Sequence, residues 1–352
     1  MNSAERRIDL SALRIALTEM DSRLTAAQML ERLVAAGLDR LPWPGGGATL
    51  NRWQALSLVA SHDLSLAKLY EGHTDALAIL DELGHALAAA KSQGQSARIW
   101  GVWAAESPQG KALIDTDSAA GQTLLSGGKC WCSGASTATH GLMTAWTQTN
   151  AQPQLVAVEI GQPGIVVNSA AWQAVGMAGS ASVDVAFDGA RAEPVGEPGQ
   201  YLTRTGFWQG GAGVAACWFG GALALASALH RTLRLGGAQA KGEFRRAACG
   251  KVDLELRSTA ALLREAAAWI DGHAKADARA VALRARLAAE RCARTVLDEV
   301  GRTLGAGPFC RDARFARMAA DLPVFIRQSH AERDFAALGD AVSSEALEAW
   351  SL

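Results

Sequence analysis

The pair Cys130 and Cys132 is the first place where residue type and spacing could support chemistry. In a strand, where side chains alternate, both thiols would lie on the same face, and two thiolates can bind a metal ion. No second Cys or His pair lies nearby in the sequence. The six cysteines are instead scattered through the chain, as free thiols of a reducing compartment are. We therefore expect two buried thiols and no metal site.

The composition of the chain restricts the classes of protein to which it can belong. With 49% apolar and 20% charged residues, the 352-residue chain is too apolar to be disordered and long enough for two or three packed units. Its 34 basic and 35 acidic residues leave a formal net charge of -1, which gives no argument for binding nucleic acid or an anionic membrane. Charges from Glu5 to Asp9 interrupt the start of the chain, so we expect no export segment and a cytoplasmic location.

Residues 1–97 have the pattern of an all-helical domain. Apolar residues recur at steps of three and four from Leu10 to Leu24. Thr25 and Gln28 have the spacing of a capping box that opens the next helix. Further helices are predicted over 51–60, 65–71 and 74–91.

Residues 98–195 have the composition of a β-barrel. Short runs rich in Val, Ile, Thr and Trp are bounded by Gly, Ser, Asn and Pro, with no helical pattern between them. From Val183 to Phe187, apolar residues alternate with Asp184 and Ala186, as in a strand with one buried face. Strands are predicted over 99–103, 123–125, 129–133, 142–147, 155–160, 164–168 and 183–187.

Residues 196–352 are predicted to form a four-helix bundle. Apolar residues at helical spacing indicate long helices from Phe244 to Ile270 and from Ala289 to Leu304. The most apolar stretch, from Gly213 to Leu229, is shorter than the ~20 residues that a membrane span requires. We expect it to be the central helix of the bundle, and we expect no membrane partner.

Five strings in a fixed order carry a family resemblance. They are Asp63-Leu64-Ser65-Leu66-Ala67 with Gly72-His73, Gly127-Gly128-Lys129-Cys130-Trp131-Cys132-Ser133-Gly134, Val175-Gly176-Met177 through Phe187-Asp188, Pro194 to Tyr201, and Thr303-Leu304-Gly305-Ala306-Gly307-Pro308-Phe309 with Arg311-Asp312. Together with the order of helical domain, barrel and bundle, they resemble the acyl-CoA dehydrogenase superfamily over nearly the whole chain, as a divergent member. The resemblance implies an α+β multidomain fold and an FAD-dependent oxidoreductase. Such an enzyme dehydrogenates an acyl thioester by hydride transfer to flavin N5.

By this resemblance, the flavin ring lies on the barrel. Trp131 falls where the family packs a tryptophan on the ring, and Ser133 falls where a hydroxyl lies near N5. An indole is a large flat apolar wall, and a hydroxyl can bond a reduced N5. As one of eleven tryptophans, Trp131 could alternatively fill the barrel. Ala105 and Glu106 lie where the family contacts the flavin pyrimidine, although Ala105 replaces a Thr and loses one hydrogen bond.

The resemblance also implies that the adenosine half of FAD is held by a neighbouring subunit, in a homodimer or homotetramer. The family's R-x-x-F-G string is degraded here to Arg234-Leu235-Gly236-Gly237. The glycine turn persists as Gly305, Ala306 and Gly307, whose small residues allow a phosphate or ribose to approach the backbone. Arg234 could bond two phosphate oxygens, or lie solvated at a helix end where its charge complements the dipole.

The family's catalytic glutamate is replaced at both of its known places. One place matches Gly210-Gly211, and the other matches Ala320. Asp321, beside Ala320, is the candidate base, with a carboxylate about one methylene shorter than that of a glutamate. Before Leu322-Pro323, it could instead be a turn or cap residue.

Three functions therefore stand. The first, which we prefer from the sequence, is an acyl-CoA dehydrogenase with Asp321 as base. The second is a flavin monooxygenase, which activates oxygen and needs no such base; His140 or His330 would then bond the flavin-bound oxygen or a substrate hydroxyl. The third is a non-catalytic flavin-binding homologue.

Overall fold

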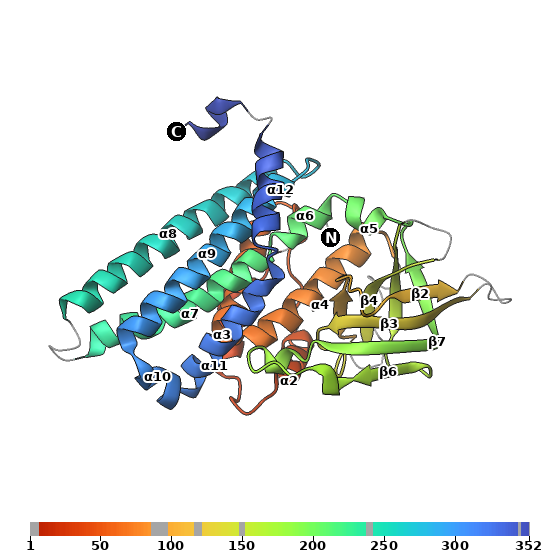
Figure 1. Ribbon diagram of the computed structural model, residues 1–352, viewed down its shortest axis with the longest axis horizontal. Helices are drawn as coiled ribbons and strands as arrows, with labels where there is room; N and C mark the ends of the chain where they lie inside the picture. Colours follow the sequence, from red (N-terminus) through yellow and green to blue (C-terminus); the bar gives the residue numbers. More distant parts are fainter. Residues whose placement is uncertain are drawn as a thin grey trace.

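The computed structural model describes residues 7–85, 98–115, 122–147, 152–236, 242–343 and 346–351. Helices from both ends of the sequence form an elongated body on one side of the molecule, and a twisted sheet forms the other side (Figure 1). The order of elements along the chain is helices, then strands, then helices, as predicted.

The N-terminal part contains the helices α1 (Leu10–Thr18), α2 (Ala26–Ala35), α3 (Thr49–His62) and α4 (Leu64–Glu82). The predicted capping box of α2 is confirmed, because the Thr25 side chain accepts from the Gln28 N–H and the Gln28 side chain accepts from the Thr25 N–H. The predicted break between 71 and 74 is wrong, because α4 runs straight through Gly72. A Cβ at Gly72 would lie 3.7 Å from the amide nitrogen of Val102, so the glycine lets the helix lie close to a strand. Residues 86–91 of the prediction lie outside the described part of the chain.

The sheet contains β1 (Trp100–Trp103), β2 (Ala112–Asp115), β3 (Thr123–Cys132), β4 (His140–Ala145), β5 (Gln154–Glu159), β6 (Ile165–Asn168) and β7 (Val183–Val195). Its order is β1-β4-β5-β7-β3-β2, with β6 also paired to β7. Trp146, just beyond β4, exchanges backbone hydrogen bonds with Ala112 and Ile114 of β2, so the sheet curls back toward itself. The predicted barrel is therefore a curled half-barrel. Strand β2 was not predicted, and the two runs at 123–125 and 129–133 form one strand.

The buried Trp103 ring anchors this sheet. It is 1% exposed, and a Cβ at Gly101 or Gly141 would come within 2.6 or 2.2 Å of it. Both neighbours are glycines because any side chain there would occupy the space of the ring.

The C-terminal part contains α5 (Gln200–Thr203), α6 (Gly206–Gly211), α7 (Val214–Leu235), α8 (Glu243–Gly272), α9 (Arg279–Leu304), α10 (Ala306–Arg311), α11 (Ala313–Phe325) and α12 (Glu332–Val342). Among the described residues, the stretch Gly206–Leu235 is long and apolar enough to cross a membrane, with a mean hydropathy of 1.7, but 78% of its most apolar window is buried in the protein. Helix α7 packs between α3 and α9, as expected for a central helix. A Cβ at Gly220 of α7 would lie 2.3 Å from the Ser57 carbonyl oxygen, so the glycine permits the close approach of α3. The two helical parts thus share one core.

Candidate active site at the junction of sheet and helices

Trp131 lies at the end of β3, on a backbone irregularity that turns its ring outward. The β3–β7 register shifts between Lys129 and Cys132, and Trp131 has a φ of 63°, a left-handed conformation that is unfavourable for a tryptophan. The side chain is 57% exposed, and its ring meets Trp172 edge-on with centroids 6.4 Å apart. Trp131 therefore does not fill the barrel; its ring presents apolar surface outside it.

Ser133 belongs to a hydroxyl cluster beside this ring. Its Oγ lies 2.7 Å from Ser182 Oγ, which lies 3.1 Å from Ser180 Oγ. The Trp103 Nε1–H donates to the Ser133 carbonyl at 3.0 Å and holds the end of the strand in place. Nearby, the buried Nε1 of Trp172 has no hydrogen-bond partner among the described residues. An exposed indole beside a hydroxyl pair fits a planar heterocycle with hydrogen-bonding edges.

Asp321 lies on α11, on the helical side of the same junction. It is 3% exposed, and its Oδ1 accepts the Met177 N–H at 2.5 Å. Burial raises the pKa of Asp321 to about 6, although the Met177 N–H opposes this rise. A Cβ at Gly176 would lie 2.0 Å from the Ala320 carbonyl oxygen, so the 176–177 turn sits directly on α11. Since Ser180 Oγ also donates to the Met177 carbonyl, a chain of hydrogen bonds connects Asp321 to the hydroxyl cluster.

Ala105 and Glu106 follow β1 and are exposed. The Glu106 carboxylate accepts from Lys129 Nζ at 2.8 Å, from Thr144 Oγ1 at 2.6 Å and from Trp146 Nε1 at 3.1 Å. Burial raises the pKa of Glu106, but the hydrogen bonds from Lys129, Thr144 and Trp146 and the charge of Lys129 together outweigh burial, so the net pKa is lowered. Because Lys129 is 1% exposed, Glu106 neutralises a buried ammonium group. Because its carboxylate already accepts these three hydrogen bonds, we expect a ligand to contact the backbone of Ala105 and Glu106 and not the Glu106 side chain.

The other predicted cofactor residues lie far from this junction. Arg234 is exposed on the last turn of α7. Gly305 lies between α9 and α10, Ala306 and Gly307 begin α10, and all three are exposed. Figure 1 shows that these helix ends lie at the end of the bundle away from the sheet. Within one chain, Trp131 and Ser133 lie at the same junction as Asp321. Arg234 and the Gly305–Gly307 turn, the second group of candidate residues, lie apart from it. Gly237 lies outside the described residues.

The two candidate histidines and the cysteine pair lie outside this junction of Trp131, Ser133 and Asp321 or make only local contacts. His140 stacks at a tilt on Trp100, with ring centroids 4.8 Å apart, and burial lowers its pKa. His330 is mostly exposed and its Nδ1 lies 3.4 Å from Asp334 Oδ1. Of the two thiols predicted to be buried, Cys132 is buried and Cys130 is only partly buried. No metal-binding cluster of His, Cys, Asp and Glu occurs within the described ranges.

A charged face of α4 was missed by sequence reasoning. Lys68, Glu71 and Asp75 follow at steps of three and four among the buried residues of α4, with side chains only 15%, 13% and 18% exposed. Lys68 Nζ pairs with Glu71 Oε2 at 2.9 Å, and Arg52 Nη2 pairs with Asp75 Oδ1 at 2.5 Å. Burial raises the pKa of Asp75 to about 6. The spacing of these charges was the signal that could have revealed this face.

The Asp75 end of this face borders a cavity of about 250 Å³ that Gly210 also lines. Asp75 lines the cavity with Glu82, Arg204 and Gln209. Arg204 Nη1 bonds Glu82 Oε2 at 2.6 Å, but its buried Nε has no partner among the described residues. A carboxylate from α4 therefore shares a cavity with Gly210, one of the two residues that the sequence resemblance aligns with a catalytic glutamate.

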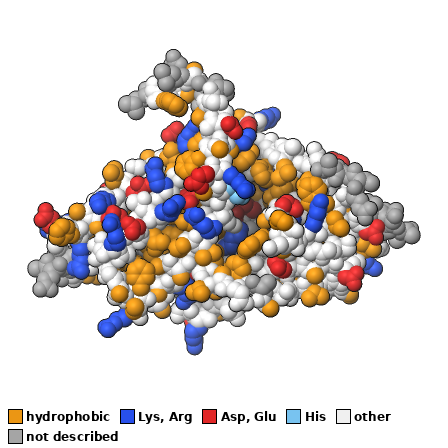
Figure 2. All heavy atoms as spheres, in the orientation of Figure 1, with side chains coloured by type: hydrophobic (Ala, Val, Ile, Leu, Met, Phe, Trp, Pro, Cys, Tyr) orange, Lys and Arg blue, Asp and Glu red, His pale blue; other side chains and the backbone are white. Residues whose placement is uncertain are grey.

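Helix α4 borders both the junction and the cavity. Leu69 packs against Gly134, next to Ser133, since a Cβ on Gly134 would lie 2.7 Å from Leu69 Cδ2. Asp75 is six residues further, about 9 Å along the helix axis. Figure 2 shows a hollow near the centre of the face where helices meet sheet, with basic, acidic and histidine side chains around it.

No protein-family model and no curated protein matches the chain. Solved structures do match over nearly its whole length. KijD3 in complex with FMN and dTDP-3-amino-2,3,6-trideoxy-4-keto-3-methyl-D-glucose is 19% identical with a TM-score of 0.78, covering 98% of this chain and 97% of that one. TdsC from Paenibacillus sp. A11-2 with FMN and indole is 18% identical with a TM-score of 0.73, covering 94% of each chain. Methanesulfinate monooxygenase MsuC from Pseudomonas fluorescens is 19% identical with a TM-score of 0.72, covering 96% and 97%. At these identities the likeness shows that the chain shares their fold.

Proposed function

We propose that the protein is a flavin-dependent oxidoreductase whose flavin ring lies against Trp131 and Ser133. The main support for this proposal is the Trp131 indole. An unfavourable backbone conformation holds it outward, beside the Ser133–Ser182 hydroxyl pair. An unfavourable backbone conformation costs folding free energy, and such conformations cluster at ligand-binding sites. We therefore infer that a bound group covers the Trp131 ring. The FMN bound by KijD3 and TdsC, which have the same fold, supports this choice of group.

FMN is favoured over FAD by the degraded R-x-x-F-G string and by the FMN that KijD3 and TdsC bind. FAD, the cofactor predicted from sequence, requires Arg234 and Gly305–Gly307 of a neighbouring subunit in a homodimer or homotetramer to reach this junction. FMN has no adenosine half and requires neither these residues nor the missing phenylalanine of the R-x-x-F-G string. The protein should therefore retain FMN after removal of its flavin and incubation with an equimolar mixture of FMN and FAD. Selective retention of FAD would overturn this choice.

Within this class we propose a monooxygenase that acts on a small polar molecule. A bound flavin, once reduced, supplies the activation of oxygen. Arg204, which lines the cavity, would donate from its guanidinium group to a substrate oxygen, and Asp75, with a pKa of about 6, would hold or accept a proton there. This charged cavity is a poor environment for a hydrocarbon chain, because leaving its polar groups unsatisfied against apolar carbon is costly. TdsC, a dibenzothiophene monooxygenase, and MsuC support this reaction class.

The second candidate is the acyl-CoA dehydrogenase predicted from sequence, acting on an acyl thioester with Asp321 as base. It is favoured by the position of Asp321 at the same junction as Ser133 and by its raised pKa of about 6. Against it, Asp321 is nearly inaccessible and one of its oxygens already accepts a backbone N–H.

The two reactions are separated by one set of assays on the purified protein. Bound flavin is first identified by absorbance and mass spectrometry. Oxygen uptake that requires NADH, a flavin reductase and an added small sulfur, nitrogen or aromatic compound supports the monooxygenase. Anaerobic bleaching of the flavin by acyl-CoA thioesters, without such oxygen uptake, supports the dehydrogenase instead. A protein that binds no flavin after reconstitution overturns both reactions.

A further inference from the structure

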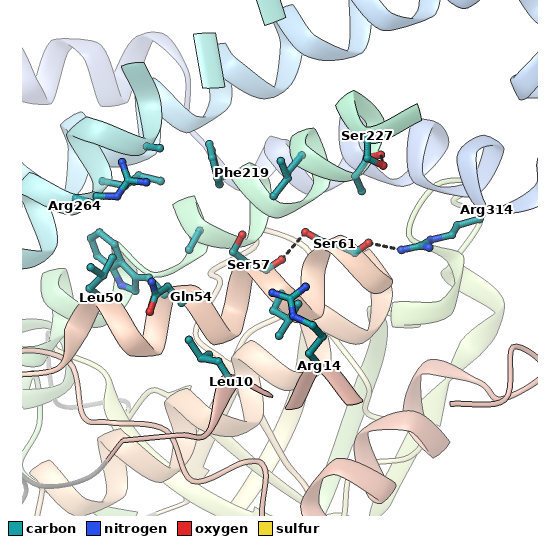
Figure 3. A pocket seen from close by; sticks show the side chains of 17 residues that line it. Leu10, Arg14, Leu50, Gln54, Ser57, Ser61, Phe219, Ser227, Arg264 and Arg314 are labelled. Carbon is teal, nitrogen blue, oxygen red and sulfur yellow. Dashed lines mark hydrogen bonds between the residues drawn. The ribbon is translucent and has the colours of Figure 1, made fainter. Parts of the chain in front are cut away.

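A second cavity, of about 400 Å³, opens on the helical body. Helices α3 and α7 form its floor, and α1, α8 and α11 contribute to its rim (Figure 3). The α3 residues that line it follow the three-and-four spacing of one helix face, and the α7 residues do the same. The apolar part of the floor includes Leu50, Trp53, Phe219 and Leu223.

Three arginines from three different helices surround this apolar floor. They are Arg14 of α1, Arg264 of α8 and Arg314 of α11, and no acidic residue in the described part of the chain lines the cavity with them. None of the three forms an ion pair with a carboxylate in the described part of the chain. Arg314 donates to the Ser61 carbonyl at 2.8 Å, which leaves its charge unneutralised. In Figure 3, Arg264 lies at one end of the cavity, with Arg14 and Arg314 toward the other.

We propose that this cavity binds an amphipathic organic anion. Its apolar part would lie on Phe219 and Leu223, and its anionic group would be held by the arginines. Three unpaired positive charges raise the local potential and attract an anion, whereas the aromatic and aliphatic floor favours an apolar body. The volume lies within the range of small-molecule sites. The inference is independent of the proposed flavin chemistry, because none of the residues at Trp131, Ser133 or Asp321 lines this cavity.

Decanoate is a suitable probe, because it joins a carboxylate to a flexible apolar chain. Isothermal titration of the full-length protein should show decanoate binding more tightly than decanol, with no binding of decyltrimethylammonium. Octanoate, shorter by two methylene groups, should bind about tenfold more weakly if the chain is buried on the floor. Raising the salt concentration should weaken decanoate binding, since the arginines are exposed. Equal binding of decanoate and decanol would overturn the proposal.

Variants locate the binding. Arg14→Gln and Arg264→Gln should each weaken decanoate binding by about tenfold, and Ala224→Trp should abolish it by filling the space. Arg333→Gln, on an exposed arginine of α12, is the matched control and should bind as the parent does. Thermal melting checks that each variant is folded. If Ala224→Trp does not fold, the two arginine variants decide alone, because both side chains are exposed. Unchanged affinity in both arginine variants would refute the site.

Two other occupants are distinguished by parallel measurements. Binding to phosphatidylglycerol vesicles that is lost in Arg264→Gln, without binding of free decanoate, would identify a lipid surface and overturn the small-molecule proposal. Sedimentation velocity tests a second copy of the chain. Dimers that dissociate in Ala224→Trp and that exclude decanoate would show that a protein surface covers the cavity. Decanoate binding with unchanged sedimentation supports the proposal.

Discussion

Replacing Asp321 with Asn should stabilise the protein above neutral pH and leave its stability unchanged near pH 4. The pKa of this buried carboxyl is raised from 3.8 to about 6 in the folded state. Between these two values the folded protein binds more protons than the unfolded chain does, so stability falls as the pH rises through 4 to 6. The difference of about two pKa units corresponds to about 3 kcal/mol lost once the carboxyl is ionised. Asparagine never ionises, and its Oδ1 can still accept the Met177 N–H.

Urea unfolding followed by circular dichroism at pH 4, 6 and 8 measures this effect. The free energy of unfolding of Asp321→Asn relative to the parent should rise with pH and level off at about 3 kcal/mol above pH 7. Asp340→Asn, on an exposed carboxyl of α12, is the control and should show no such trend. A difference that does not vary with pH, or a variant less stable than the parent at pH 8, would refute the argument from burial.

Four further outcomes are expected. Trp131→Ala should lose most of its bound flavin, measured by absorbance after gel filtration, whereas Trp131→Phe should keep it. Gly176→Ala should lower the free energy of unfolding by about 1 to 3 kcal/mol in urea, because its Cβ would overlap the Ala320 carbonyl. Glu106→Ala should cost about 2 kcal/mol by the same measurement, since it strands the buried Lys129 while solvent partly screens the loss. Asp75→Asn should slow substrate-dependent oxygen uptake with flavin content unchanged; an unchanged rate would remove Asp75 from the mechanism.

Local patterns predicted much of the fold because they report which face of an element is buried. The Thr25–Gln28 capping box and the alternation from Val183 to Phe187 were found where expected. The strand β2 was missed because its four residues carry too little alternation to distinguish them from a loop. The predicted break near Gly72 reflects the same limit, since this glycine serves contact with a strand and not the end of a helix.

The candidate site was predictable only in part. Trp131 and Ser133 were predicted from the family resemblance, and the structure adds the outward turn of the indole. The position of Asp75 in the cavity could not be predicted. The spacing of Lys68, Glu71 and Asp75 shows that they share a helix face, but it does not show which distant segment packs against that face.

By itself, the sequence determined the order of helices, strands and helices and the apolar central helix, because periodicity and composition are properties of neighbouring residues. Only the tertiary structure decided that Asp321 holds Met177, that Asp75 stands beside Gly210 and that three arginines surround one apolar floor. These are contacts between residues far apart in the chain. Their partners are selected by how whole elements pack, and no local pattern encodes that choice.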